Sequence, residues 1–436
     1  MDRYLNFDLE ISKRSTQYQA RVIASPNGEA RNRFDFPFDQ QEVDQIISDF
    51  SHTRSFILNE KGDNSDNSKP SANDIANQIR LFGETLFNAV FQKSIGETYR
   101  ESKVTADNDK AGLRIRLRFP ENPELINIPW EFLFDQRSHS FLSLSGNTSI
   151  VRYMELSIAA KSMQIKPPLR VLVIISDPKD YPALNVAKER DKIQQALTPL
   201  EQNQRIKLEI IEHATLRKIT QSIRKHNCHI IHFIGHGDFN EARNEGVIII
   251  ENKKGNGLQV SSQRIATIIE GSRSSRLIVL NACEGGITST ENIFSGVAQS
   301  VVKKGVPAVL AMQYVITDKC AIVFSETFYN ALSRGSPIDT SLSLARLAIY
   351  NQPNEIEFGT AALYMRAQSG RLFGKNKKKF KPESDQFSLD NTKGKRSKKI
   401  TLAIFTATIL VLLITSGFAM VLYKVLTMFI PIIQRG

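Results

Sequence analysis

Short apolar runs alternate with amphipathic helical stretches from residue 169 to residue 366, and this alternation constrains the fold more than any other feature of the chain. Runs such as Ile230–Ile234 are apolar at almost every position, as expected for strands that are buried on both faces. Helical patterns between such strands predict a mostly parallel β-sheet that is flanked by helices on both sides. We therefore expect an α/β fold here.

The individual elements of this α/β part can be read from its patterns, and we assign residues 156–373 to one domain. Strands are predicted at residues 169–175, 207–211, 229–234, 277–282, 306–312 and 359–365. Helices are predicted at residues 187–200, 215–226, 294–304, 318–333 and 337–350, with one more helix after the hairpin-like stretch 246–260.

Residues 1–155 have a different pattern and are assigned to an N-terminal α+β region. Two strands, at residues 6–22 and 31–38, are predicted around the turn Ser25–Gly28. A helix is predicted from residue 74 to about residue 98, where apolar residues recur at helical spacing.

Residues 112–119 alternate strictly between apolar and basic side chains, which predicts a half-buried strand. We expect its arginines, Arg114, Arg116 and Arg118, to face solvent rather than to bind an anionic ligand. The single tryptophan, Trp130, is predicted to anchor this region against the sheet domain by packing.

The C-terminal part of the chain predicts a membrane anchor. Residues 400–423 are 24 residues without a charge. As a helix rising ~1.5 Å per residue, they would cross a ~30 Å hydrocarbon core. The basic run at 393–399 indicates the cytoplasmic side and would attract anionic lipids. We expect a basic tether at 374–399, one transmembrane helix, and a short tail at 424–436.

Composition limits the compartment and the partners. The three cysteines cannot form a disulfide framework, and the N-terminus lacks a signal-peptide pattern, so we expect the body in the reducing cytoplasm. The net charge is +12, but residues 371–399 carry eleven Lys and Arg residues against three acidic ones. Because the body is nearly neutral, a nucleic-acid partner is not expected.

Two predicted strands end in side chains that could act together. His236 lies between two glycines and is followed by Asp238, while Cys283 lies 47 residues further on and is followed by Glu284. Each alone could be a turn residue or a core thiol. If the strands are neighbours, His236 and Cys283 form a general base–nucleophile pair, and the amides of Gly237 and Cys283 suit an oxyanion hole.

Other chemistries have little support in the sequence. Four histidines and Cys228 lie between residues 226 and 236, but His232 and His236 would be ~13 Å apart on a strand, too far to share a metal ion. His229 and His232 are therefore expected in or beside the core. Neither a G-x-S-x-G elbow nor a Walker-type phosphate loop occurs, and no cofactor is predicted. Cys228 and Cys320 are interpreted as structural.

The two motifs resemble those of a known family. H-F-I-G-H-G at 232–237 and L-N-A-C-E-G-G at 280–286 are similar to the catalytic motifs of CHAT domains, caspase-like peptidases related to caspases and separases. The spacing of the histidine and the cysteine agrees with the caspase layout of ~50 residues. Further similar stretches are found at residues 305–318, 328–332, 343–346 and 358–366, and looser ones at 128–133 and 148–153, so that the resemblance covers roughly residues 75–370.

The resemblance implies a caspase-like fold and a cysteine endopeptidase that uses His236 as base, Cys283 as nucleophile, and the amides of Gly237 and Cys283 at the oxyanion. Several CHAT proteins cleave a partner protein in bacterial immunity or cell death. The tetratricopeptide repeats after which the family is named are not visible in this sequence, and a predicted membrane span is present instead.

We therefore predict a membrane-tethered cysteine endopeptidase with a protein substrate. A catalytically weak binding or scaffold module of the same fold is the alternative, and a small-molecule binder is a weaker one. Candidates for the substrate pocket are Asp238, Glu284 and residues 313–318, and an acidic pocket would favour a basic P1 residue. The sequence leaves the oligomeric state and the activating signal open.

Overall fold

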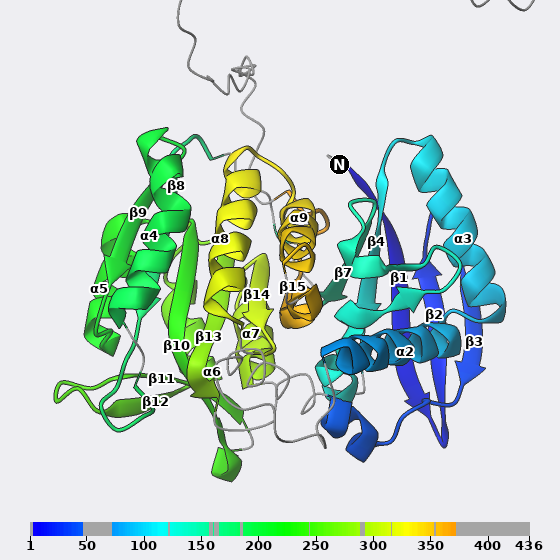
Figure 1. Ribbon diagram of the computed structural model, residues 1–436, viewed down its shortest axis with the longest axis horizontal. Coiled ribbons are helices and arrows are strands. Elements are labelled where there is room, and N and C mark those ends of the chain that lie inside the picture. Colours follow the sequence, from blue (N-terminus) through cyan, green and yellow to red (C-terminus); the bar gives the residue numbers. More distant parts are fainter. Residues whose placement is uncertain are drawn as a thin grey trace, which may run out of the picture. The chain divides into compact units, whose positions relative to one another are not determined.

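In the computed structural model, one large sheet with helices on both faces dominates the chain (Figure 1). The described residues are 3–46, 72–120, 123–156, 160, 165–183, 186–243, 245–287, 293–314, 316–352 and 355–371. The chain divides into two units, Met1–Lys377 and Lys378–Gly436, and all described residues belong to the first.

Five parallel strands form the part of the sheet that the sequence predicts as α/β. Their order is β9, β8, β10, β13, β14. Their bounds are Ile206–Ile211, Leu169–Ile175, Ile230–Asn240, Leu277–Ile287 and Ala308–Met312, in the same order. We call the side where these strands begin the amino edge and the side where they end the carboxyl edge.

The N-terminal region continues the same sheet. β15 (Ala361–Met365) is antiparallel to β14 and parallel to β7 (Thr148–Tyr153). β7 is followed by β4 (Gly112–Arg118) and β1 (Tyr4–Arg14), which run parallel to it. The antiparallel strands β2 (Gln17–Ala24) and β3 (Ala30–Phe34) complete this side. Residues on both sides of the proposed boundary at 155 thus share one sheet.

A hairpin branches from the carboxyl end of β10. Residues 230–234 of β10 pair with β8 and residues 230–235 pair with β13. Residues 237–240 pair with β11 (Glu245–Glu251), which in turn pairs with β12 (Gly257–Ser261). The remaining short elements are β5 (Phe134–Asp135), β6 (Ser140–Phe141) and the 3-10 turns η1 (Pro123–Asn127), η2 (Trp130–Phe132), η3 (Leu142–Leu144), η4 (Glu241–Arg243) and η5 (Glu355–Thr360).

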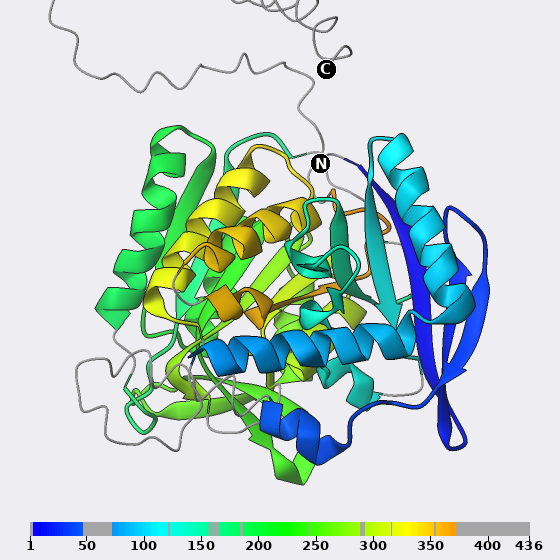
Figure 2. The same cartoon turned by 45° about the vertical axis from the view of Figure 1, so that its right-hand side comes forward.

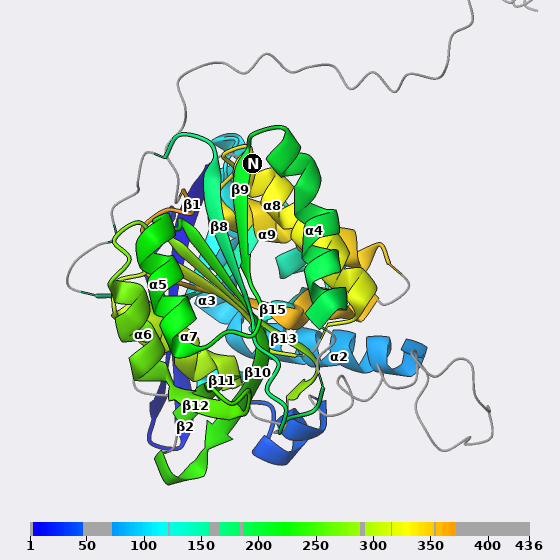
Figure 3. The same cartoon turned by 90° about the vertical axis from the view of Figure 1, so that its left-hand side faces the viewer.

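Helices cover both faces of the parallel strands (Figure 3). One face packs against α4 (Val186–Gln202), α8 (Asp318–Ser333) and α9 (Ile338–Tyr350), and the other against α5 (Leu216–His226), α6 (Ser262–Glu270) and α7 (Ile293–Lys303). Side chains alternate between the two cores, so Ile230 and Ile234 belong to one and Ile231 and Phe233 to the other. In the N-terminal region, α2 (Ala72–Val90) and α3 (Lys93–Asn108) flank the sheet (Figure 2).

The arginines of β4 correct one expectation. Arg114 and Arg116 are only 2% and 5% exposed, so the prediction that they face solvent is wrong. Arg114 forms a buried ion pair with Asp339 of α9, and Arg116 forms one with Asp8 of β1. The alternation of apolar and basic residues indicated a strand with one solvent-exposed face, but β4 lies inside the sheet and both of its faces are covered.

The predicted membrane anchor lies outside the described residues, as do the tether from residue 374 and the tail. In the part of the chain that the structure describes, no helix combines the length and the apolar character needed to cross a bilayer.

Candidate functional site

The two motif residues lie at the ends of neighbouring strands. β10 and β13 run parallel, with Ile234 opposite Asn281 and Gly235 opposite Ala282. His236 and Cys283 each follow directly, so their backbones meet at the carboxyl edge. The side chains of Cys283 and Glu284 are outside the described residues, and their roles stay predictions.

The pairing of β10 and β13 is interrupted at this point. After Gly235 and Ala282, the next paired residues are Gly237 and Ile287, so that residues 283–286 form a bulge. Bulges near the ends of strands re-aim side chains and are common at active sites. The backbone that carries Cys283 is therefore turned away from regular sheet geometry.

Gly235 is required by close packing rather than by its backbone angles. A Cβ atom there would lie 2.9 Å from the Phe233 ring and 3.1 Å from the carbonyl oxygen of Ser176. Ser176 also donates its backbone N–H to the carbonyl of Ile234 over 3.0 Å. The end of β8 thus lies directly beside the strand that positions His236.

The His236 side chain is buried and lacks ordinary hydrogen bonds. It is 1% exposed, and neither ring nitrogen has a partner among the described residues. Burial lowers the pKa of His236, while the nearby Pro182 carbonyl and the Asp177 carboxylate act to raise it. The Pro182 carbonyl therefore lies close to the ring, although outside regular hydrogen-bond geometry. A neutral imidazole of this kind can accept a proton.

The segment that follows β8 covers this imidazole. The Tyr181 ring lies 5.5 Å from the His236 ring, centroid to centroid. The segment is fixed to the β11–β12 hairpin, because Lys179 N–H donates to the Gly255 carbonyl over 2.9 Å and the Asp180 carboxylate accepts from Gly257 N–H over 2.5 Å. A side chain at Gly257 would overlap the Tyr181 ring.

Asp238, the predicted pocket residue, is on the same hairpin. Its carboxylate accepts hydrogen bonds from the Phe239 backbone N–H over 2.8 Å and from the Gln259 side chain over 3.3 Å. It also helps to raise the pKa of Tyr181, after burial, which is the largest cause. Asp238 is therefore near the cover over His236 and partly exposed.

Three further buried polar groups at this edge were not anticipated from the sequence. Ser176 Oγ, Asn281 Oδ1 and Thr360 Oγ1 have no hydrogen-bond partner in the described ranges, although each residue is at most 7% exposed. An unsatisfied buried polar group typically costs about 1–3 kcal/mol. Several at one edge are expected where a ligand supplies the missing partners. A polar residue near the end of an apolar strand is the sequence signal that could have found them.

His232 in β10 and His229, the residue before this strand, belong to the core, as the sequence indicates. His232 is 1% exposed and its Nδ1 lies 3.0 Å from the Tyr329 hydroxyl, and burial lowers its pKa to about 3. His229 accepts a hydrogen bond from the Arg170 backbone N–H over 3.0 Å. Burial, then Arg170 and Arg276, lower the pKa of His229 to about 4.

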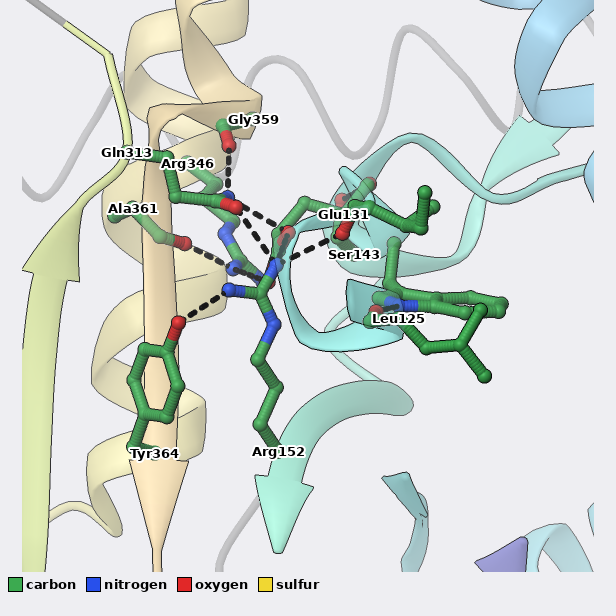
Figure 4. Close-up of polar contacts among 11 residues, drawn as sticks. Leu125, Glu131, Ser143, Arg152, Gln313, Arg346, Gly359, Ala361 and Tyr364 are labelled. Atoms are coloured by element: carbon green, nitrogen blue, oxygen red, sulfur yellow. Dashed lines mark hydrogen bonds and ion pairs between the residues drawn. The ribbon is translucent and has the colours of Figure 1, made fainter. Parts of the chain in front are cut away.

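Residues 313–318, another candidate for the pocket, mostly point into the protein. Gln313 is 4% exposed and belongs to a buried network with Glu131 and Arg152 (Figure 4). Thr317 is buried too: its hydroxyl caps α8 and also binds Glu357. The Asp318 side chain is outside the described residues. This network was not anticipated from the sequence.

Arg152 is the centre of that network. Its guanidinium donates to the Tyr364 hydroxyl over 2.7 Å, to Gln313 over 2.7 Å and to Glu131 over 2.8 Å, and it also reaches the Ile128 carbonyl. We call this group, with Arg346 of α9, the junction, because it joins the η2 turn to β7, β14, β15 and α9. Trp130 lies beside it, fully buried and stacked on Phe119. Charged residues inside apolar stretches are the sequence signal that could have indicated the junction.

Comparisons with known proteins give one family match. The sequence profile of the CHAT domain matches residues 80–380. No curated protein sequence matches the chain. Among solved structures, separase from Saccharomyces cerevisiae, in its complex with securin, aligns with a TM-score of 0.47 and 10% identity over 83% of this chain. The initiator caspase Dronc from Drosophila aligns with a TM-score of 0.32 and 12% identity over 51% of this chain and 96% of its own. The chain spans 30% of the length of the separase chain.

Proposed function

This chain belongs to the CHAT domain family, and from that premise we propose that it is a cysteine endopeptidase that cleaves a protein partner. His236 is the general base and Cys283 is the nucleophile. The observation that carries the proposal is the register of β10 and β13, in which Gly235 is opposite Ala282 and both strands end at one edge.

The proposed reaction is that of a thiol beside an imidazole. His236 takes the proton of the Cys283 thiol, and the thiolate adds to the carbonyl carbon of the scissile peptide bond. The amides of Gly237 and Cys283 donate hydrogen bonds to the oxyanion. As the intermediate collapses, the imidazolium gives its proton to the leaving amine. His236 then deprotonates a water molecule that hydrolyses the thioester, which releases the acid and restores the thiol.

The surroundings of His236 support its role as base. Burial lowers its pKa, so that the imidazole is neutral near pH 7 and can take a proton. The Pro182 carbonyl and the Asp177 carboxylate favour the imidazolium that forms after the transfer. Burial is the larger effect, so the pKa of His236 is lowered overall.

Asp238 and Glu284 are our candidates for contact with the substrate. Asp238 is partly exposed beside Tyr181, and Asp177 and Asp180 lie in the same covering segment. Carboxylates gathered there favour a basic P1 side chain through charge attraction. We further propose that residues 400–423 hold the enzyme in a membrane, with the basic run at 393–399 and the body on the cytoplasmic side.

The burial of His236 favours a second candidate function. A side chain that is 1% exposed and covered by Tyr181 is not open to a substrate unless the cover moves. In this second function the chain is a binding or scaffold module of the same fold with little catalysis.

One experiment separates the two functions. New protein N-termini are compared between cells that carry the wild-type chain and cells that carry Cys283→Ala. We expect a set of cleavages that disappears in Cys283→Ala and persists in the matched control Cys228→Ala, whose thiol is buried at the far end of β10. Identical N-termini in wild type and Cys283→Ala, together with no labelling of Cys283 by a thiol-reactive peptide probe, would favour the scaffold.

A further inference from the structure

The amino edge of the parallel strands carries mostly one sign of charge. The segments that lead into β8, β9, β10, β13 and β14, with the α8–α9 turn and the end of β15, hold these cations: Lys166, Arg170, Arg205, Arg224, Lys225, Arg273, Arg276, Lys303, Lys304, Arg334 and Arg366. The acidic residues described at this edge are Glu201, Glu209, whose carboxylate lies 3.0 Å from His226 Nε2, Glu270 and the buried Asp339. The edge is therefore strongly basic, although residues 1–370 as a whole are nearly neutral.

Much of this charge is available to a partner. Arg224, Lys225, Arg273, Lys303 and Arg334 are exposed, and no ion pair joins any of them to an acidic side chain among the described residues. Lys304 is different, since it lies 3.4 Å from Glu270. Cations commonly occupy the last turn of a helix, where they complement its dipole, and this accounts for Arg224, Lys225 and Lys303. It does not account for Arg273 and Arg276, which lie in the loop before β13.

The carboxyl edge has a mixed charge. The segments that follow the same strands and lead through the β11–β12 hairpin carry Asp177, Asp180, Glu212, Asp238, Glu245 and Glu251 together with Lys179, Arg243, Lys253 and Lys254. His236 lies at this edge, close enough to Asp177 for the carboxylate to act on its pKa. The parallel block is thus polarised, with a basic surface at one end of its strands and the candidate site at the other.

The chain also leaves the sheet at the amino edge. The backbone N–H groups of Arg366 and Ala367 both bond to the carbonyl of Pro307, the residue before β14. Only a few described residues follow, up to Arg371, and the sequence then continues into the predicted tether with its own basic run at 393–399.

We propose that the amino edge lies against an anionic lipid surface and that the carboxyl edge, with His236, faces away from the membrane. This inference rests on the membrane attachment proposed above, but not on catalysis. Basic side chains next to a leaflet that contains anionic lipid are attracted to it, within a Debye length of about 8 Å at physiological ionic strength. Docking fixes the orientation of the site, so that substrates are taken from the aqueous side.

The test uses the full chain with Cys283→Ala, reconstituted into vesicles of phosphatidylcholine alone or with phosphatidylserine. Amide hydrogen exchange is followed at residues 222–228 and 271–276 of the amino edge, and at residues 252–256 of the β11–β12 turn. We expect exchange at the amino edge to slow by about tenfold when phosphatidylserine is present, and to recover in high salt, because the attraction is electrostatic. Residues 252–256 should not respond.

Two triple variants sharpen the result. Arg224→Gln/Lys225→Gln/Arg273→Gln removes exposed cations from the amino edge and should abolish the protection. Lys253→Gln/Lys254→Gln/Arg264→Gln removes three exposed cations from the hairpin turn and the first turn of α6, and should leave the protection unchanged.

Several outcomes would overturn the inference. These are equal exchange with both lipids, protection that survives the amino-edge variant, or protection by single-stranded RNA and not by anionic vesicles. Flotation of the chain with the vesicles is measured in parallel. A chain that floats only with anionic vesicles supports the docking edge without the anchor. A chain that floats with neither kind of vesicle overturns both the docking edge and the anchor. Cys283 is replaced in every variant of this test. If these variants dock while the wild-type chain cleaves no protein, the proposed catalysis is wrong and the inference about docking stands.

Discussion

The junction around Arg152 and the carboxyl edge around His236 are both buried parts of one sheet, and they differ in how far their polar groups are paired. Arg152 makes four hydrogen bonds, and Glu131 and Gln313 are bonded to each other as well as to Arg152, although Arg152 Nε, Arg346 Nε and Glu131 Oε1 have no hydrogen-bond partner in the described ranges. At the carboxyl edge, both nitrogens of His236 and the Asn281 side-chain oxygen have no partner within the described residues. Buried polar groups in native proteins are nearly always satisfied. The contrast indicates that the junction holds the fold together, while the carboxyl edge is prepared for a ligand.

The largest effect expected from this contrast is on catalysis. His236→Ala should lower kcat/KM for the native substrate by about a thousandfold or more, since a general base alone contributes about 10²–10⁴ and Cys283 depends on it. The free energy of unfolding should stay unchanged or rise slightly, because the substitution removes an unsatisfied buried group. Cleavage rates and urea denaturation check the two parts, and a variant that unfolds easily while it still cleaves would reverse the interpretation.

A substitution in the junction should instead lower the free energy of unfolding. Glu131→Gln removes the carboxylate that neutralises Arg152 and leaves two buried guanidinium groups, those of Arg152 and Arg346, without an acidic partner in the junction. Breaking a buried pair from one side typically costs about 3–5 kcal/mol of unfolding free energy.

The matched control is Glu84→Gln, because Arg80 and Glu84 form an ion pair on the surface of α2. Such pairs contribute about 0–1 kcal/mol. Urea denaturation of both variants measures the difference. Equal losses of unfolding free energy would mean that the ion pairs of Glu131 contribute no more than a surface ion pair does.

His232 tests the contrast within a single strand, because it is as buried as His236 but has a partner in Tyr329. Its pKa falls from 6.5 to about 3 on folding, so below pH 6.5 the unfolded chain binds a proton that the folded chain does not. Stability should therefore fall as the pH drops from 6.5 toward 3, by about 2 kcal/mol between pH 6.5 and pH 5 at ~1.4 kcal/mol per pH unit.

The variant His232→Phe/Tyr329→Phe removes both the imidazole and its hydroxyl partner, and should flatten this part of the pH dependence. Denaturation midpoints at pH 7 and pH 5 measure the change. A variant that keeps the full acid sensitivity of the wild type would assign the effect to other groups, of which His229 is the first candidate because its pKa is lowered to about 4.

The two regions also differ in how far the sequence predicts them. The position of His236 and Cys283 at one edge follows from short apolar runs and the rule that parallel strands end together, which are local features. The partners of Arg116 and Arg114 lie 108 and 225 residues away in the chain, and Gln313, the partner of Arg152 that follows β14, lies 161 residues away. Pairings over such separations leave no periodic pattern in the sequence, so Arg114 and Arg116 were expected at the surface and the network of Arg152 was not anticipated. The bulge at 283–286 also depends on pairing between distant segments, because β10 pairs with β13 up to Gly235 and with β11 from Gly237 onward.

The smallest expected effect concerns the cover over His236. A methyl group at Gly257 would overlap the Tyr181 ring, so Gly257→Ala should move Tyr181 away from the imidazole. We expect His236 to react a few times faster with diethyl pyrocarbonate, which attacks neutral imidazoles, with modification at each histidine read by mass spectrometry.

Gly146→Ala is the control, since a methyl group there meets nothing within 4 Å. His232 provides an internal reference in both variants, because it is fully buried in the core away from the cover. An unchanged rate at His236 would show that the cover moves freely in solution, and the absence of partners for His236 would then reflect one position of a mobile segment. A selective increase would show that Tyr181 limits access to the site, so that a substrate must displace it before His236 can act.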